Sequence, residues 1–172
     1  MDVEQAVNRI RAIRHFAPRQ LPDEELRAIL DAGRRAGSSK NLQRWQFIVV
    51  RDRDRLHMLA TVGESAAHLA GGATAVALIT PDPHAPGAPL SITWDLGRAA
   101  QNMMLVAWNR GIGSVPATVH DQELCRAILG YAAHEHCQFI LNFGYPAERR
   151  LVDRAPRAGG RRSLDEVVRW DR

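Results

Sequence analysis

The sequence is poor in several features that would define whole classes of protein. It has two cysteines, Cys125 and Cys137, which are too few for a disulfide framework or a cysteine-based metal site. No apolar run approaches the length of a membrane-spanning helix. A Gly-x-Gly-x-x-Gly fingerprint and a Walker motif are both absent, so we expect neither a Rossmann dinucleotide site nor a P-loop.

A single soluble domain fits the length and composition. The chain of 172 residues is long enough to bury a hydrophobic core, and 45% hydrophobic with 24% charged residues is ordinary for a globular protein. The sequence shows no internal repeat, and residues 1–4 do not resemble the start of a signal peptide. We therefore expect one domain spanning residues 1–172, located in the cytoplasm and without a membrane partner.

The basic charge of the chain has two interpretations. The formal net charge is +4, and Lys40 is the only lysine among otherwise arginine cations. A net basic charge is one sign of nucleic-acid binding. In residues 51–55, however, Arg and Asp alternate as on a solvated surface, and an aromatic content of 6% offers few rings for base stacking. A nucleic-acid-binding module is the third-ranked hypothesis, and we expect no nucleic-acid partner.

Residues 134–137, His-Glu-His-Cys, contain groups that bind metal ions elsewhere. Structural metal sites usually draw their ligands from two such clusters, and this sequence lacks a second one. We expect a surface loop followed by a buried Cys137, and no metal site.

The hydrophobic pattern predicts alternating helices and strands, compatible with an α+β or an α/β fold. Helices are predicted at residues 2–10, from Pro22 to an end between Gly33 and Gly37, from residues 52–54 to Ala60, at 94–110 and at 121–129. Strands are predicted at residues 46–51, 73–80 (central in a sheet) and 138–146. Four prolines in residues 81–89 predict a loop, and residues 111–118 are predicted to leave the long helix as a loop.

The segment of residues 37–45 concentrates side-chain donors and acceptors just before a predicted strand. They are the hydroxyl and amide groups of Ser38, Ser39, Asn41 and Gln43. Such groups suit a planar heteroaromatic ring with polar edges, and the Trp45 ring can brace the loop from beneath. Gly, Ser and Asn are also the ordinary residues of loops, so a purely structural turn stays open as an alternative.

Two arginines near the N-terminus are spaced to meet at one point. Arg11 and Arg14 are three residues apart, with apolar Ile13 and Phe16 available as buried anchors. Arginine stays charged and donates in a planar fork, which suits a phosphate monoester. Two solvated arginines at a helix end are the alternative interpretation.

These segments and several others resemble, in order, the motifs of the nitroreductase-like flavoproteins. The matching segments are residues 11–16 with 21–26, 38–45, 95–103, 111–114, 144–146 and 161–168. The resemblance covers nearly the whole chain. It implies an α+β fold with a central, mostly antiparallel mixed sheet flanked by helices, and a homodimer with two FMN sites between its subunits.

The same resemblance implies a cofactor-binding set but no catalytic side chain. Arg11, the backbone N–H of Ala12, Arg14 and a late arginine would hold the FMN phosphate, Arg162 being preferred to Arg161. Ser38, Ser39 and Asn41 would reach the flavin ring from the partner subunit. The backbone of Pro116, Ala117 and Thr118 would lie against the ring near N5.

The resulting expectation is an FMN-dependent oxidoreductase. It would pass a hydride from NAD(P)H through flavin N5 to an acceptor such as a nitroaromatic or a quinone. A protein that binds flavin without turnover, for storage or sensing, is the alternative. The acceptor, the preference for NADH or NADPH and any use of a deazaflavin stay open.

Overall fold

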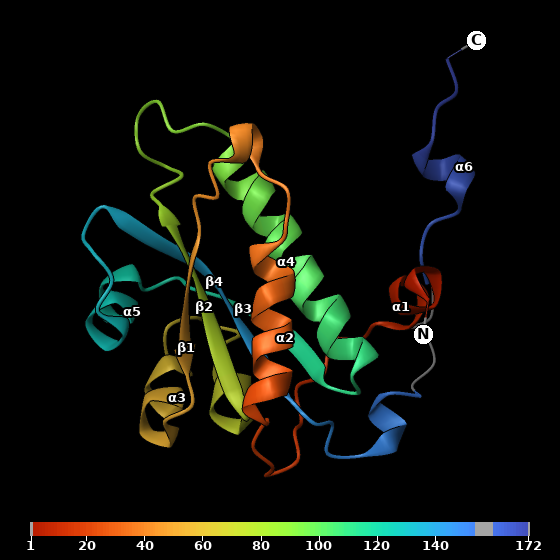
Figure 1. The fold of residues 1–172 in the computed structure, drawn as a ribbon, viewed down its shortest axis with the longest axis horizontal. Helices are drawn as coiled ribbons and strands as arrows, with labels where there is room; N and C mark the ends of the chain where they lie inside the picture. Colours follow the sequence, from red (N-terminus) through yellow and green to blue (C-terminus); the bar gives the residue numbers. More distant parts are fainter. Residues whose placement is uncertain (1, 154–159, 172) are drawn as a thin grey trace.

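The computed structural model describes residues 2–153 and 160–171 (Figure 1). Four strands form one sheet in the order β1-β2-β4-β3. They are β1 (Gln46–Val50), β2 (Thr74–Pro81), β3 (Gly113–Thr118) and β4 (Glu135–Gly144). All three neighbouring pairs are antiparallel, so the antiparallel prediction is confirmed. A mixed sheet would also contain parallel pairing. In the described residues, parallel pairing is limited to one isolated bridge between Ala12 and Ser114.

Helices cover both faces of the sheet. One face carries α2 (Asp23–Arg34) and α4 (Ser91–Asn109), which lie side by side in Figure 1. The other face carries α3 (Arg53–Leu59), the 3₁₀ helix η2 (Ala67–Gly71) and α5 (Gln122–Leu129). The remaining described helices are α1 (Val3–Arg9), η1 (Ser39–Asn41), η3 (Arg149–Leu151) and α6 (Leu164–Val167). Each face therefore has its own hydrophobic core.

The central strand was predicted correctly because its sequence is apolar on both sides. Every residue of β2 from Thr74 to Thr80 is buried between the two cores. β4, its other neighbour, begins at Glu135 rather than Gln138, so the surface loop predicted for residues 134–136 is largely wrong. The buried Cys137 is confirmed.

The loop predicted for residues 111–118 is also wrong, because residues 113–118 form the edge strand β3. Pro116 hides the pattern, since proline normally interrupts a strand. An edge strand tolerates it where the missing N–H would face away from the neighbouring strand. Pro116 meets that condition because it faces the same side as Ser114, away from β4.

Helix ends follow the local signals closely. Asp52 and Asp121 cap α3 and α5 by accepting backbone N–H bonds, as their sequence positions predict. α2 ends at Arg34, between Gly33 and Gly37 as predicted, and Gly33 lies in its last turn. A Cβ there would come within 2.1 Å of the terminal methyl of Met103, so this glycine allows close packing of α2 on α4.

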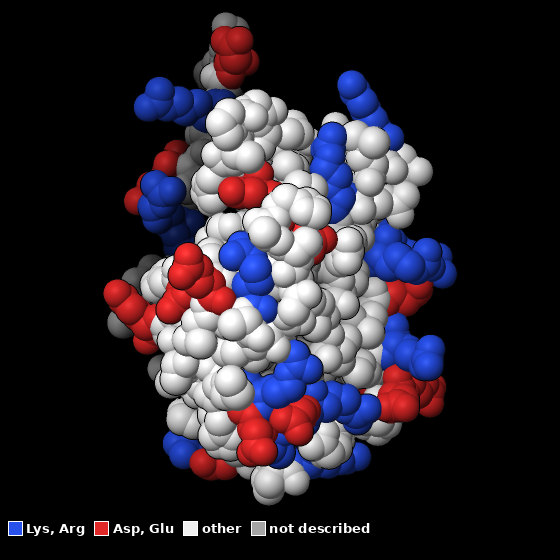
Figure 2. Space-filling view, turned by 90° about the vertical axis from the view of Figure 1, so that its left-hand side faces the viewer, with Lys and Arg blue, Asp and Glu red and all other residues white. Residues whose placement is uncertain are grey.

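Many arginines serve the fold itself. Arg51 bonds Asp23 and the Leu21 carbonyl, while Arg53 donates to two carbonyl groups at the end of η2. On the face shown in Figure 2, basic and acidic side chains are interspersed and form no continuous basic patch. This arrangement agrees with a solvated surface. Within the described residues, no helix combines the length and apolar character needed to cross a membrane.

Candidate functional site

The N-terminal segment with the two arginines lies directly on the edge of the sheet. Ile13 donates its N–H to the Ser114 carbonyl at 3.0 Å, and its side chain is 2% exposed. A Cβ on Gly113 would come within 2.6 Å of Ile13, so only glycine permits this approach. Farther along, Phe16 forms a bridge with Pro146. The apolar anchors predicted from the sequence therefore hold Arg11 and Arg14 beside β3.

The two arginines are used differently. The Arg11 guanidinium donates to the carbonyls of Asn8 and Ile10, at 3.0 and 2.9 Å, and so caps the end of α1. Arg14 is exposed and lines a hollow of about 500 Å³, together with Arg150 and Glu148, which pair with each other. Of Arg11 and Arg14, Arg14 is thus the one placed to bind an anion in the hollow.

The free edge of β3 presents backbone groups to the N-terminal segment that carries Arg14. Ser114 directs its carbonyl outward to Ile13, whereas Val119 donates its N–H inward to Gln138. Antiparallel strands alternate in this way, so Pro116 and Thr118 face outward and Ala117 faces β4. Proline has no N–H, so Thr118 is the predicted ring-contact residue whose N–H lies on the free edge.

The loop of residues 38–41 is held in a strained conformation by its own polar groups. Lys40, Asn41 and Gln43 have φ values of 52°, 55° and 45°, in the left-handed region that non-glycine residues rarely adopt. Ser38 Oγ accepts the Gln43 N–H at 3.0 Å, and the Gln43 side chain donates to Asn41 Oδ1 at 3.1 Å. The buried carboxylate of Asp95 accepts the Ser39 N–H at 2.8 Å.

A groove of about 510 Å³ runs beside this loop along the start of α4. Its lining residues are Ser38, Ser39, Leu90, Ser91, Trp94, Asp95 and Arg98. Trp94 is 70% exposed and Leu90 is 92% exposed. In the single chain this face of the helix is therefore open.

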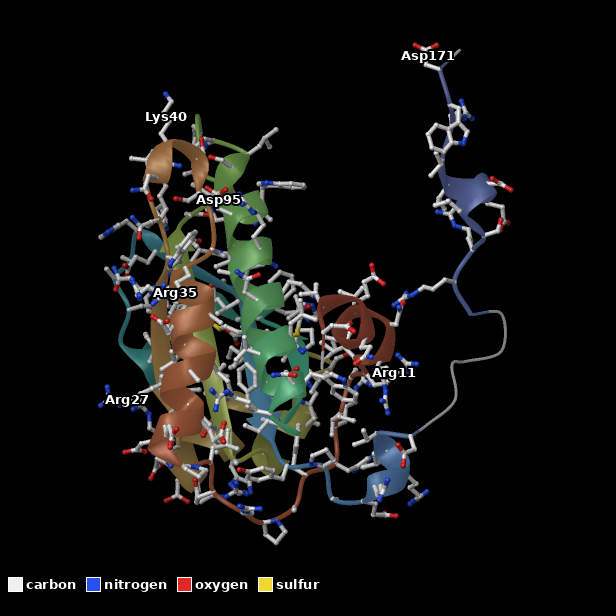
Figure 3. The ribbon with its side chains drawn as sticks, turned by 45° about the vertical axis from the view of Figure 1, so that its right-hand side comes forward. Arg11, Arg27, Arg35, Lys40, Asp95 and Asp171 are labelled. Atoms are coloured by element: carbon white, nitrogen blue, oxygen red, sulfur yellow. The ribbon has the colours of Figure 1, made fainter. Side chains whose placement is uncertain are left out.

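Within one chain the predicted site is divided between two places. Figure 3 shows Lys40 and Asp95 at one end of the molecule and Arg11 beside α1, well away from them. Arg161 and Arg162 are exposed and precede α6, which stands apart from the sheet in Figure 1. The structure therefore brings residues 11–14 to β3, and it leaves the Ser38–Asn41 loop and the late arginines elsewhere.

Comparisons with known proteins identify the family. The model of the "Nitroreductase family" matches residues 8–145. A protein of Archaeoglobus fulgidus named "Putative NADH dehydrogenase/NAD(P)H nitroreductase" is 33% identical over 149 residues, covering 81% of this chain and 83% of that protein. This chain belongs to the nitroreductase family.

Solved structures of other proteins share the fold. An FMN-dependent nitroreductase of Clostridium difficile superimposes with a TM-score of 0.76 at 24% identity, covering 86% of this chain and 89% of that one. A protein of Desulfovibrio desulfuricans solved in complex with FMN gives a TM-score of 0.78 at 24% identity, covering 100% and 98%.

Two polar residues of this member of the nitroreductase family were not singled out from the sequence. They are His68 on η2 and Asn142 on β4, and Asn142 Nδ2 donates to the His68 carbonyl at 2.6 Å. The sequence does contain a signal for Asn142, because it is a polar residue within the otherwise apolar run of residues 139–143. Asp95 entered the sequence analysis only within residues 95–103, which resemble a family motif. A carboxylate among the apolar positions of a helix indicates that it has a hydrogen-bond donor as its partner.

Proposed function

We propose that the chain is an FMN-dependent oxidoreductase that uses NAD(P)H as the electron donor. The observation that carries the proposal is the exposed Arg14, which lines the hollow and follows Ile13, the residue bonded to Ser114 on the outward edge of β3. The same edge carries the outward Thr118 N–H. A backbone edge suits a flat ring, and an exposed arginine suits a terminal phosphate. The fold shared with proteins that use or contain FMN supports the same cofactor.

The residues of the site fit a mononucleotide. Gly113 and Gly144 allow the N-terminal segment to lie on the sheet, which brings Arg14 beside β3. When bound there, FMN would supply two-electron chemistry, taking a hydride from NAD(P)H and passing it to a nitroaromatic, a quinone or a similar acceptor. The Thr118 N–H would then bind the flavin ring, and Arg14 would bind the phosphate. No side chain is assigned a proton-transfer role.

The rest of the site would come from a second copy of the chain. The Ser38–Asn41 loop lies far from Arg14 in one subunit, so a homodimer is required for both to touch one flavin. Apolar side chains left exposed on the single chain support such an interface. They include Val3, Leu90, Trp94, Leu164, Val167 and Trp170.

The phosphate assignment is tested by comparing FMN with riboflavin, which lacks the phosphate. A charge-assisted hydrogen bond contributes about 1.5–3 kcal/mol, so Arg14→Ala should weaken FMN binding by about tenfold to a hundredfold. Riboflavin binding should change much less. Arg27→Ala is the matched control, because Arg27 is an exposed arginine on α2, distant from Arg11 in Figure 3.

Arg162→Ala is measured in the same titration, because the family resemblance assigns a late arginine to the phosphate, although Arg162 precedes α6, which stands apart from the sheet in one chain. Flavin fluorescence gives the affinities, with FAD as a third ligand. An FMN affinity within twofold of wild type for both variants, equal weakening of riboflavin, or tight FAD binding without FMN binding would refute the assignment.

A flavin-binding protein without turnover is the second candidate, because the same anchors serve both roles. Steady-state oxidation of NADH or NADPH in the presence of a nitroaromatic or quinone separates the two. Turnover that requires bound FMN supports the oxidoreductase, and tight FMN binding without turnover supports storage or sensing.

A further inference from the structure

Two segments that carry arginines are hydrogen-bonded to each other beside the hollow that Arg14 lines. Ala147 donates its backbone N–H to the His15 carbonyl at 3.0 Å. His15 directly follows Arg14, and Ala147 lies three residues before Arg150. This bond fixes the two segments side by side, and the hollow of about 500 Å³ is accordingly lined by both Arg14 and Arg150.

The consecutive arginines of η3 have different carboxylate partners. Arg149 Nε donates to Asp153 Oδ2 at 3.2 Å, farther along the chain, and Arg149 is absent from the described residues that line the hollow. Arg150 does line it. Its Nη2 donates to Glu148 Oε1 at 2.9 Å, and its Nε donates to the other oxygen of the same carboxylate. Arg150 is therefore the arginine of η3 that shares the hollow with Arg14.

The lining of the hollow carries more positive than negative charge. Arg14 and Arg150 are both cationic, whereas Glu148 is the one carboxylate among the described lining residues. The hydrogen bond from Arg150, more than any other influence, holds the pKa of Glu148 below its usual value, so this carboxylate is ionised at neutral pH. Two guanidiniums against one carboxylate leave a net positive charge, which attracts a further anion.

The pair of Glu148 and Arg150 is one that a stronger anion can replace. The two side chains are 52% and 77% exposed, and an ion pair in contact with water is held weakly. A phosphate monoester carries nearly two negative charges at neutral pH, and two of its oxygens match the planar fork of an arginine. Because Arg150 is exposed, its side chain can turn from Glu148 to such a phosphate without displacing the core.

We propose that Arg150 is a second phosphate-binding residue of this hollow, and that Glu148 holds it beside the empty site until a phosphate monoester takes the place of the carboxylate. This inference rests on the proposed function, in which Arg14 binds the FMN phosphate. It adds a cation from the same subunit as Arg14. Glu148 is then a competitor, because its pair with Arg150 must break before the phosphate is fully bound.

The test uses the full-length chain and the two neighbouring arginines as a matched pair. Arg150→Ala should weaken FMN binding by about tenfold, because the phosphate loses a charged donor. Riboflavin, which lacks the phosphate, should bind within about twofold of wild type. Arg149→Ala is the control, since it removes the same charge from a side chain that pairs with Asp153. Its affinity for FMN should also stay within about twofold of wild type.

Glu148→Gln tests the competition. It should tighten FMN binding by about threefold to tenfold and leave riboflavin unchanged, because no ion pair has to break. In the Arg150→Ala background the same substitution should have a smaller effect, since the two residues act as a pair. An equal effect in both backgrounds would show that Glu148 acts only as a nearby negative charge, and it would overturn the exchange.

Inorganic phosphate provides a measurement that does not depend on flavin. Added to the flavin-free protein, it should raise the Tm most in Glu148→Gln, less in wild type and least in Arg150→Ala, because only the folded state binds it. Arg149→Ala should respond as wild type does. Sodium chloride at equal ionic strength is the control for general screening of charge.

The outcomes separate this inference from the proposed function. If wild type binds FMN but Arg150→Ala matches Arg149→Ala, or weakens riboflavin as much as FMN, Arg150 does not bind the phosphate and the proposed function stands. If wild type binds inorganic phosphate through Arg150 but binds neither flavin, the proposed function fails and the anion site remains. If no variant responds to FMN or to inorganic phosphate, both are wrong.

Discussion

At the scale of single residues, Asp95 is the side chain on which the Ser38–Asn41 loop depends. Its side chain is 5% exposed, and it accepts the Ser39 N–H at 2.8 Å, while its nearest cation, Arg98, is 4.0 Å away. Left-handed conformations at Lys40, Asn41 and Gln43 disfavour this loop shape, so a fixed acceptor is needed to hold it.

Replacing Asp95 should therefore damage the loop more than the rest of the fold. Asp95→Ala leaves the Ser39 N–H without its partner, and we expect a loss of about 1–3 kcal/mol in the free energy of unfolding, measured with urea. Asp95→Asn retains an oxygen acceptor and should lose less. Equal losses for the two variants would show that the bond to Ser39 is not the cause.

At the scale of elements, β3 is the strand on which the proposed site depends. Its free edge is supported at one end by residue Ile13, which bonds Ser114. At the other end the segment after α3 presses on the strand: Gly63 lies so close that an added Cβ would be 2.1 Å from the Thr118 carbonyl oxygen. Contacts with Ile13 at one end and Gly63 at the other therefore position β3, in addition to its pairing with β4.

A side chain at Gly63 should move this strand. Because the obstacle is backbone, Gly63→Ala has no flexible neighbour to displace, and we expect a loss of about 1–3 kcal/mol in the free energy of unfolding. Gly71→Ala is the control, since a Cβ there meets no atom within 4 Å. Thermal or urea denaturation measures both. A Gly63→Ala protein as stable as the Gly71→Ala protein would disprove the steric argument.

At the scale of the whole molecule, the divided site is the main reason to expect a dimer. Arg14 and the Ser38–Asn41 loop lie in separate parts of one chain, and Trp94 is left 70% exposed beside the loop. A twofold dimer would place the loop of each subunit at the other subunit's β3 edge, giving two equal sites.

Mixed dimers test this arrangement directly. Arg14→Ala and Asp95→Ala should each weaken FMN binding, but a dimer with one copy of each holds one site free of both substitutions. If subunits exchange at random, mixing the two variants in equal amounts should restore about one site in four. FMN titration before and after mixing gives this fraction, and light scattering gives the mass.

Mixing wild type with Arg14→Ala is the negative control, because half of its sites keep Arg14 whether or not the subunits exchange. A flavin-loaded monomer at micromolar concentration would refute the shared site. So would exchanged mixtures of the two variants in which FMN binding does not recover.

Much of the fold could be predicted from the sequence because the signals are local. Asp52 and Asp121 cap helices through groups three residues away, and residues 73–80 are apolar enough to predict a central strand. The family motifs likewise lie within short segments, and the family they indicate is confirmed by the match to residues 8–145. The division of the anchors between residues 11–14 and 38–41 followed from the family resemblance, and the shared site itself stays a prediction.

Other features were decided only in three dimensions, because they join residues distant in sequence. Asp95 meets Ser39 across 56 positions, and Asn142 meets His68 across 74. Hydrogen-bond alternation with β4, not residue type, makes Thr118 rather than Ala117 face the free edge. The sequence by itself determined which chemical groups are present and which local elements they form. The tertiary structure decided which groups share a neighbourhood, since hydrogen bonding and burial depend on distance in space.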